Sequence, residues 1–164
     1  MFGLFKKVTI AHPALGPLTR SGQQWEGKIC LTAHQPIPLE IDGSKDEPHP
    51  AAAAAAMQLA NRLPALRPVI SQALLEHLEP YQEALADQDS GYAEMLEQPE
   101  DRAVIAAIRS PEDAWNAADP AGVEIGLEGG KVRLLIKFRV IWDIEHVLGA
   151  YFDDWEFMEL NGSV

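Results

Sequence analysis

Short runs of β-type hydrophobic residues occupy the first quarter of the chain. They cover residues 2–10, 25–32 and 37–41, and proline and glycine residues separate them. Runs of this length between such residues are typical of strands joined by turns. We therefore predict a small antiparallel sheet at this end, closed off by the polar stretch at residues 43–50.

Helical spacing dominates the middle of the chain. Six consecutive alanines at residues 51–56 begin a segment of strong helix formers. From residue 63 to 85, apolar residues recur at steps of three and four, which is the period of an amphipathic helix. Pro64 and Pro68 suit the opening of this second helix. Pro80 is expected to end or kink it near Glu79, because proline removes a backbone donor and clashes with the preceding turn.

Further helix signals follow this segment. Residues 86–99 are acidic and are interpreted as a loop with room for one helical turn. The acidic sequence PED at 99–101 resembles a helix start, although the apolar run at 104–108 also fits a strand. The sequence SPED at 110–113 combines an N-cap serine, a proline at the first helical position and acidic residues in the first turn. It predicts a short helix that carries Trp115.

Strict alternation of apolar and polar residues marks the last third of the chain. From Val132 to Trp142 every second residue is apolar, which gives a strand with one fully apolar face. Residues 123–128 alternate in the same way. A two-residue turn within residues 128–130 would pair the two apolar faces and would place glutamates near Lys131 and Arg133 on the other face.

A second hairpin is expected between residues 147–152 and 155–160. Asp153 and Asp154 supply a plausible two-residue turn, which would place Phe152 opposite Trp155. For Leu148 to share the face of the preceding apolar strand, the connection over residues 143–147 must be odd or contain a bulge, because side chains alternate with a period of two.

Together these elements predict an α+β fold. Its antiparallel sheet is built from the N-terminal strands and the C-terminal β-meander, and it packs against the central helices. We expect a single domain over residues 1–164, with strands in residues 1–42, mainly helices in 48–118 and the meander in 121–161.

The connection inside the meander carries the most distinctive motif. Residues 142–149 have the sequence WDIEHVLG. This segment resembles a family of uncharacterised bacterial proteins in which an apolar strand is followed by W-D-x-E-H-G-L-G and a closing hairpin. The resemblance extends from residue 110 to the C-terminus and departs at Val147, where the family usually has glycine. It implies the same α+β fold, gives no activity, and places some relatives among toxin and immunity genes.

Trp142, Asp143, Glu145, His146 and Gly149 form the candidate interaction and turn motif. Asp143, Glu145 and His146 suit a metal site or an acid–base site, because carboxylates and imidazole bind divalent metals and a histidine beside an acid can act as a general base. The structural interpretation is that Asp143 caps the turn while Glu145 and His146 face solvent or orient the loop. We favour it, because one short segment is weak evidence for a site. We expect no catalytic residue, metal or cofactor.

The other histidines and the cysteine are interpreted as structural. Cys30 alternates with Ile29 and Leu31, so we expect a buried thiol, and as the only cysteine it cannot form an internal disulfide. Four histidines lie in separate segments and are expected at the surface or in turns: His12, His34, His49 and His77.

The overall charge restricts the choice of partner. The 164 residues include 25 acidic and 13 basic ones, a net charge of −12. Such a charge repels a phosphate backbone, so we expect no nucleic-acid partner, whereas it favours a basic protein partner. Residues 1–7 lack the apolar region of a signal peptide, and no stretch reaches the roughly 20 apolar residues that span a bilayer. We therefore expect a cytoplasmic protein without membrane contact.

Three functions are compatible with these features. The leading hypothesis is a non-enzymatic protein-binding or immunity-type protein, because the chain is acidic and lacks a phosphate loop, nucleophile elbow or H-E-x-x-H pair. The first alternative is a small metal-dependent or acid–base enzyme centred on Asp143, Glu145 and His146. The second is a structural or regulatory subunit whose exposed sheet face completes a homodimer.

Overall fold

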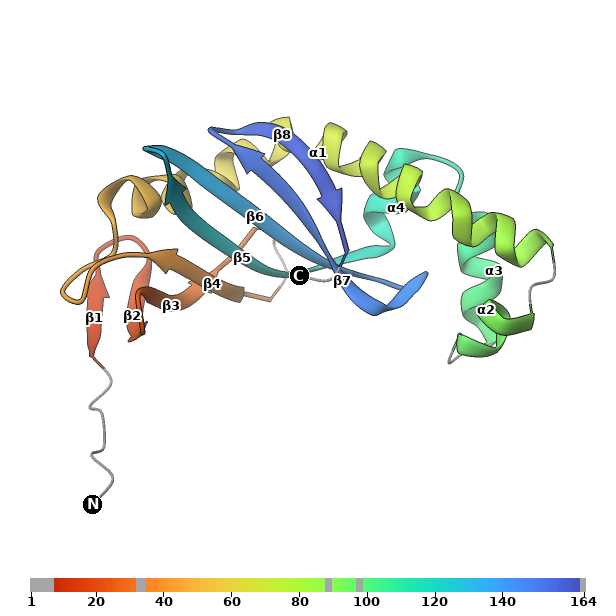
Figure 1. Ribbon diagram of the computed structural model, residues 1–164, viewed down its shortest axis with the longest axis horizontal. Coiled ribbons are helices and arrows are strands. Elements are labelled where there is room, and N and C mark those ends of the chain that lie inside the picture. Colours follow the sequence, from red (N-terminus) through yellow and green to blue (C-terminus); the bar gives the residue numbers. More distant parts are fainter. Residues whose placement is uncertain (1–7, 32–34, 88–89, 97–98, 163–164) are drawn as a thin grey trace, which may run out of the picture.

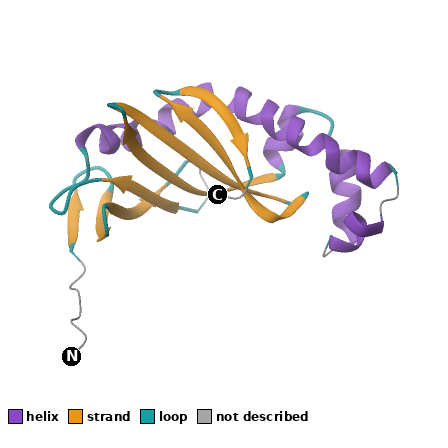
Figure 2. Cartoon of the chain, viewed as in Figure 1, coloured by secondary structure: helices purple, strands orange, loops and turns teal. Residues whose placement is uncertain are grey.

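The computed structural model describes residues 8–31, 35–87, 90–96 and 99–162, and these form one sheet and four helices (Figure 2). The strands follow each other across the sheet in sequence order. They are β1 (Thr9–His12), β2 (Gly16–Ser21), β3 (Gln24–Ile29), β4 (Ile37–Asp42), β5 (Ala118–Glu128), β6 (Lys131–Val140), β7 (Asp143–Asp153) and β8 (Glu156–Asn161). The helices are α1 (Pro50–Ala86), α2 (Ser90–Met95), α3 (Pro99–Ala107) and α4 (Pro111–Asn116). The predicted α+β fold is confirmed.

All four helices lie between β4 and β5 in the sequence, and this explains the sheet topology. Neighbouring strands are antiparallel except β4 and β5, which are parallel. A parallel pair needs a crossover connection, and the helical segment provides it. Figure 1 shows α1 running along the sheet, with its second half projecting beyond the strands beside α2 and α3. No helix among the described residues has the length and apolar character needed to cross a bilayer.

The core lies between α1 and one face of the sheet. The predicted apolar face of the 132–142 strand is confirmed, since its residues from Leu134 to Trp142 are buried and only Val132 is partly exposed. The predicted turn is also confirmed: Gly129 and Gly130 have positive φ, and Glu128 pairs with Lys131. Helix α1 contributes a stripe of buried side chains to the same core: Leu59, Leu63, Leu66, Ile70, Leu74 and Leu78.

Helix α1 corrects the prediction of two helices. It continues for 37 residues through Pro64, Pro68 and Pro80, so the expectation that Pro80 ends a helix is wrong. The three prolines are exposed, so water can reach the backbone carbonyls whose hydrogen bonds are lost. The buried stripe continues past each proline, and this packing holds the helix together where local propensity does not.

Other local predictions had mixed outcomes. Strand β2 was missed, because Gly16 and Pro17 were interpreted only as breakers. Helix α2 lies in the segment predicted as a loop with room for one helical turn, and α3 shows that residues 104–107 are helical. The capping box at Ser110 and Asp113 confirms the start of α4. Residues 2–7 of the first predicted strand, Thr32 and His34 lie outside the described residues.

The last hairpin is shifted relative to its prediction. Its turn residues are Asp154 and Trp155, both with positive φ, and Phe152 pairs with Phe157 instead of Trp155. Contacts with β6 explain this position, because Asp154 exchanges hydrogen bonds with the backbone of Val132. A bulge beside Phe152 shifts the register by one residue, so that Tyr151 pairs with Glu159.

Cys30 also differs from its prediction, because it is exposed. Ile29 and Leu31 on either side are buried. Alternation therefore places the intervening thiol on the opposite, solvent-facing side.

Candidate functional site

The motif at residues 142–149 forms a bulge at the start of β7. Val140 pairs with Asp143, and Phe138 pairs with Leu148. One residue of β6 therefore lies opposite the four residues 144–147 of β7, and this bulge brings Leu148 to the buried face that also holds Trp142. Only Asp154 and Trp155 have positive φ among the described residues other than glycine, so Val147 avoids the strained conformation that the missing glycine would have allowed.

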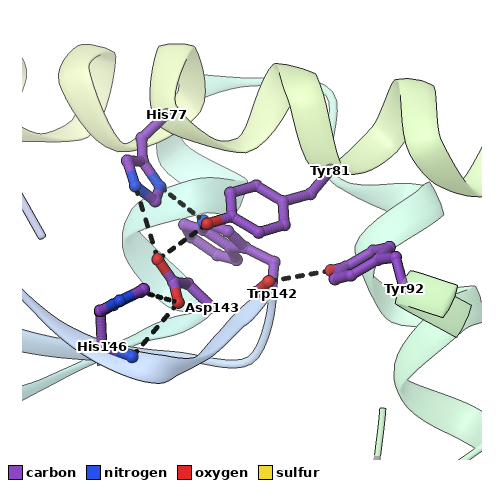
Figure 3. A network of polar contacts seen from close by, with 6 residues as sticks. All are labelled: His77, Tyr81, Tyr92, Trp142, Asp143 and His146. Carbon is purple, nitrogen blue, oxygen red and sulfur yellow. Dashed lines mark hydrogen bonds and ion pairs between the residues drawn. The ribbon is translucent and has the colours of Figure 1, made fainter. Parts of the chain in front are cut away.

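Asp143 is the centre of a polar network between α1 and this bulge (Figure 3). Its side chain is only 6% exposed. One carboxylate oxygen, Oδ1, lies 2.8 Å from Nδ1 of His146 and accepts the backbone N–H of His146 at 3.2 Å. The other, Oδ2, accepts the Tyr81 hydroxyl at 2.8 Å and lies 3.7 Å from Nε2 of His77. These donors compensate for the cost of burying a carboxylate.

Trp142 extends the network to α2. Its carbonyl oxygen accepts the Tyr92 hydroxyl at 2.9 Å, and its indole N–H donates to Nδ1 of His77 at 3.1 Å (Figure 3). An indole nitrogen can only donate, so Nδ1 of His77 must be unprotonated and the neutral ring carries its proton on Nε2, toward Asp143. Two hydrogen bonds on opposite sides of Trp142 thus connect α1, α2 and β7.

The network changes the acidity of its members. Burial lowers the pKa of His77, an effect that the charge of Asp143 opposes and that of His146 reinforces. Burial, followed by the hydrogen bond to Asp143, raises the pKa of Tyr81. Burial, followed by the charge of Asp143, raises the pKa of Tyr92 to about 12. Both phenols therefore remain protonated donors at neutral pH.

The structure brings together only part of the sequence-derived motif. Trp142, Asp143 and His146 join the network. The Glu145 side chain is exposed and makes no hydrogen bond or ion pair with the described residues, while Gly149 is a buried β7 residue paired with Lys137. No three His, Cys, Asp or Glu side chains in the described part of the chain are arranged to hold a metal ion.

The sequence interpretation of the histidines is wrong for His77. It assigned His77 to the surface or a turn, whereas His77 lies in the last third of α1 and accepts a hydrogen bond from Trp142. His77 and Tyr81 are four residues apart on the helix, so their side chains share one face. That spacing was the signal in the sequence that could have placed the two residues together. Their hydrogen-bond partners, Trp142 and Asp143, lie about 60 residues further along the chain. His12 and His49 do lie at a turn and a helix cap.

Comparison with known proteins identifies the family. A family model described as a domain of unknown function, DUF6985, matches residues 14–163. The chain belongs to the DUF6985 family. The match covers the whole polar network, and it agrees with the resemblance to an uncharacterised family. Neither the curated proteins nor the solved structures contain a match.

Charge is distributed unevenly along this DUF6985 chain. Residues 76–119 contain 12 acidic and two basic residues, a net charge of −10 out of −12. We call this segment the acidic helical end; it comprises the projecting part of α1 together with α2, α3 and α4 (Figure 1). The rest of the chain holds 13 acidic and 11 basic residues. On the sheet, Lys131, Arg133 and Lys137 form ion pairs with neighbouring carboxylates, so local charges there are compensated.

The pairing of His146 with Asp143 has a chemical consequence of its own. With Nδ1–H donated to the ionised carboxylate, Nε2 of a neutral imidazole is available as a proton acceptor. The His146 side chain is 41% exposed, so a molecule from solvent can reach the ring. A histidine oriented by a buried carboxylate is suited to general acid–base chemistry.

Proposed function

We propose that this DUF6985 protein is a non-enzymatic, immunity-type binding protein that recognises a basic protein partner through its acidic helical end. The observation that carries the proposal is the concentration of ten of the twelve net negative charges in residues 76–119. A surface potential of one sign accelerates encounter with an oppositely charged partner and disfavours partners of the same sign.

The acidic side chains of this segment are available to a partner. Glu76, Glu79, Glu83 and Glu94 are exposed. The two basic residues are engaged within the segment, because the guanidinium of Arg102 donates to the carbonyl of Ala93 and that of Arg109 to the carbonyl of Ile108. These contacts are to neutral carbonyl groups, so neither arginine neutralises a carboxylate of the segment. Glu112 forms an ion pair with Arg67, which lies on α1 outside the segment.

The polar network supports this surface by fixing its orientation. Tyr81 and His77 attach α1 to the β7 bulge, and Tyr92 attaches α2 to the same bulge. A surface held in place before binding loses less conformational entropy when the partner arrives. In this proposal Asp143 and Trp142 act as structural residues behind the binding surface.

Affinity capture of partner proteins, with wild type and two charge variants as bait, tests the proposal. The first variant is Glu79→Gln, Glu83→Gln, Glu94→Gln on the acidic helical end. The control is Glu26→Gln, Glu40→Gln, Glu156→Gln on the sheet strands, which removes the same charge. We expect wild type and control to retain a basic protein at about 0.1 M salt, where the screening length is about 10 Å, and the first variant to lose it. Equal retention by both variants, or capture of acidic proteins alone, would contradict the proposal.

The His146–Asp143 pair favours acid–base catalysis as a second candidate function. Its test is turnover of a panel of carboxylic and phosphoric esters by wild type, His146→Ala and the neighbouring control Glu145→Ala. Catalysis by His146 requires turnover that is lost in His146→Ala and kept in Glu145→Ala. Turnover that is the same in both variants, or absent from wild type, rejects this candidate.

A further inference from the structure

An apolar hollow lies within the acidic helical end. Its volume is about 430 Å³, and it is bounded by α3, by α4 with the start of β5, and by the turn between β6 and β7. Val104, Ala107, Ile108 and Ile141 supply apolar side chains, while Asp113 and Asp119 supply carboxylates. Specific pockets range from about 300 to 1,000 Å³, so the hollow has room for one or two side chains of a partner.

The apolar part of the hollow is open to solvent. Val104 is 47% exposed, one of the most exposed large hydrophobic side chains in the described residues, whereas Ile108 below it is buried. An apolar surface beside polar residues often marks an interaction site when it is concave and contiguous. A partner side chain placed here would remove Val104 from water.

The walls of the hollow are fixed by hydrogen bonds. The side-chain amide of Gln82 on α1 donates to the carbonyls of Ile105 and Ile108, at 2.7 and 2.8 Å, and so holds the end of α3. The capping box of Ser110 and Asp113 fixes the start of α4. The hollow is therefore formed before any partner binds.

Charge around the hollow determines the chemistry of its occupant. Asp113 and Asp119 are exposed at the hollow, and Glu100 and Asp101 lie one turn before Val104 on the same side of α3. Two basic residues lie near these carboxylates in sequence or in strand register. Arg109 donates to the Ile108 carbonyl, and Arg139 pairs across strands with Asp119. Acidic groups remain in excess around an apolar centre.

We infer that this hollow binds a basic segment of the partner protein, with one large apolar side chain inserted beside Val104 and lysine or arginine residues along the carboxylates. The inference rests on the proposed function, and it specifies the part of the acidic helical end that recognises the partner. Charge attracts many basic segments, and the hollow selects those that carry an apolar anchor.

Two synthetic peptides test this inference. The first is a lysine-rich peptide with one central leucine, and the second has alanine in place of the leucine. Fluorescence anisotropy of the labelled peptides gives their affinities for the full chain. Because burying the larger side chain favours binding, we expect the leucine peptide to bind about tenfold more tightly than the alanine peptide. The ratio should approach one in Val104→Gln and should persist in the matched control Met158→Gln, which changes an exposed methionine on β8.

The outcomes separate the hollow from the charged surface. Equal affinities of both peptides for wild type, or a ratio that survives Val104→Gln, would overturn the hollow. If both peptides nevertheless weaken in the Glu79→Gln, Glu83→Gln, Glu94→Gln variant, the proposed function would still stand. If neither peptide weakens in that variant, the proposed function itself would fail.

Discussion

Asp143 is the residue on which the link between helix and sheet depends. It accepts hydrogen bonds from Tyr81 and from the backbone of His146 while almost completely buried. In Asp143→Ala these donors lose their acceptor, so we expect the free energy of unfolding to fall by about 3 kcal/mol. Urea denaturation measures this, with Glu145→Ala as the neighbouring control, expected within about 0.5 kcal/mol of wild type. Similar losses in the two variants would show that Asp143 has no special role.

His77 should make stability depend on pH. Its pKa is lowered in the folded protein, so the unfolded chain binds more protons as the pH falls below the ordinary value of about 6.5. Its contribution to stability is therefore complete above about pH 6.5 and is lost as the pH falls through the lowered folded-state pKa. Protonation also removes the acceptor that Nδ1 offers to Trp142.

Urea denaturation between about pH 7 and pH 5, across the ordinary histidine pKa, tests this dependence. In His77→Gln, whose amide oxygen can still accept the indole N–H, we expect a smaller loss of stability on acidification than in wild type. His12→Gln, at the end of β1, should behave as wild type does. Equal pH dependence in wild type and His77→Gln would contradict the assignment.

For individual residues, the sequence indicates which of them carry reactive or polar groups but not which of them lie in contact. Asp143 and His146 are three residues apart, so their contact follows from a tight turn. His77 and Tyr81 reach the same carboxylate from a helix more than 60 residues earlier. No local periodicity encodes that distance, because it depends on how α1 packs on the sheet.

Helix α1 shows packing overriding local propensity. Pro80 is exposed inside the helix, where proline costs about 3 kcal/mol relative to alanine, less up to about 1 kcal/mol for restricting the unfolded chain. We expect Pro80→Ala to raise the free energy of unfolding by about 1 to 2 kcal/mol. Pro111→Ala is the control, because a proline at the first turn of α4 loses no helical hydrogen bond and should give no gain. Equal effects of the two substitutions in thermal melts would show that Pro80 is not strained.

Strands with strict alternation were the most predictable elements. The β5–β6 hairpin follows from two matched apolar faces and two glycines at the turn. The β7–β8 hairpin was less predictable, since Asp153, Asp154 and Trp155 each fit a turn position. Its position depends on the bonds between Asp154 and Val132, which belong to a different hairpin.

For the whole molecule, the net charge was evident from composition, but its significance was not. Counted over the full chain, −12 indicates only an acidic protein. The fold shows that much of the acidic segment, namely the end of α1 with α2 and α3, projects beyond the sheet (Figure 1). Basic side chains on β6 are paired with carboxylates of the sheet. The proposed binding surface follows from this separation of charge.

The most direct test of this surface is a nuclear magnetic resonance titration of the isotope-labelled full chain with hexalysine. Backbone amide shifts report where the basic probe binds. We expect the largest shifts within residues 76–119, on the projecting part of α1 and on α2, α3 and α4, and we expect them to diminish as salt is added. Shifts centred on the sheet around Glu26 and Glu40, or no localised shifts at low salt, would contradict this expectation.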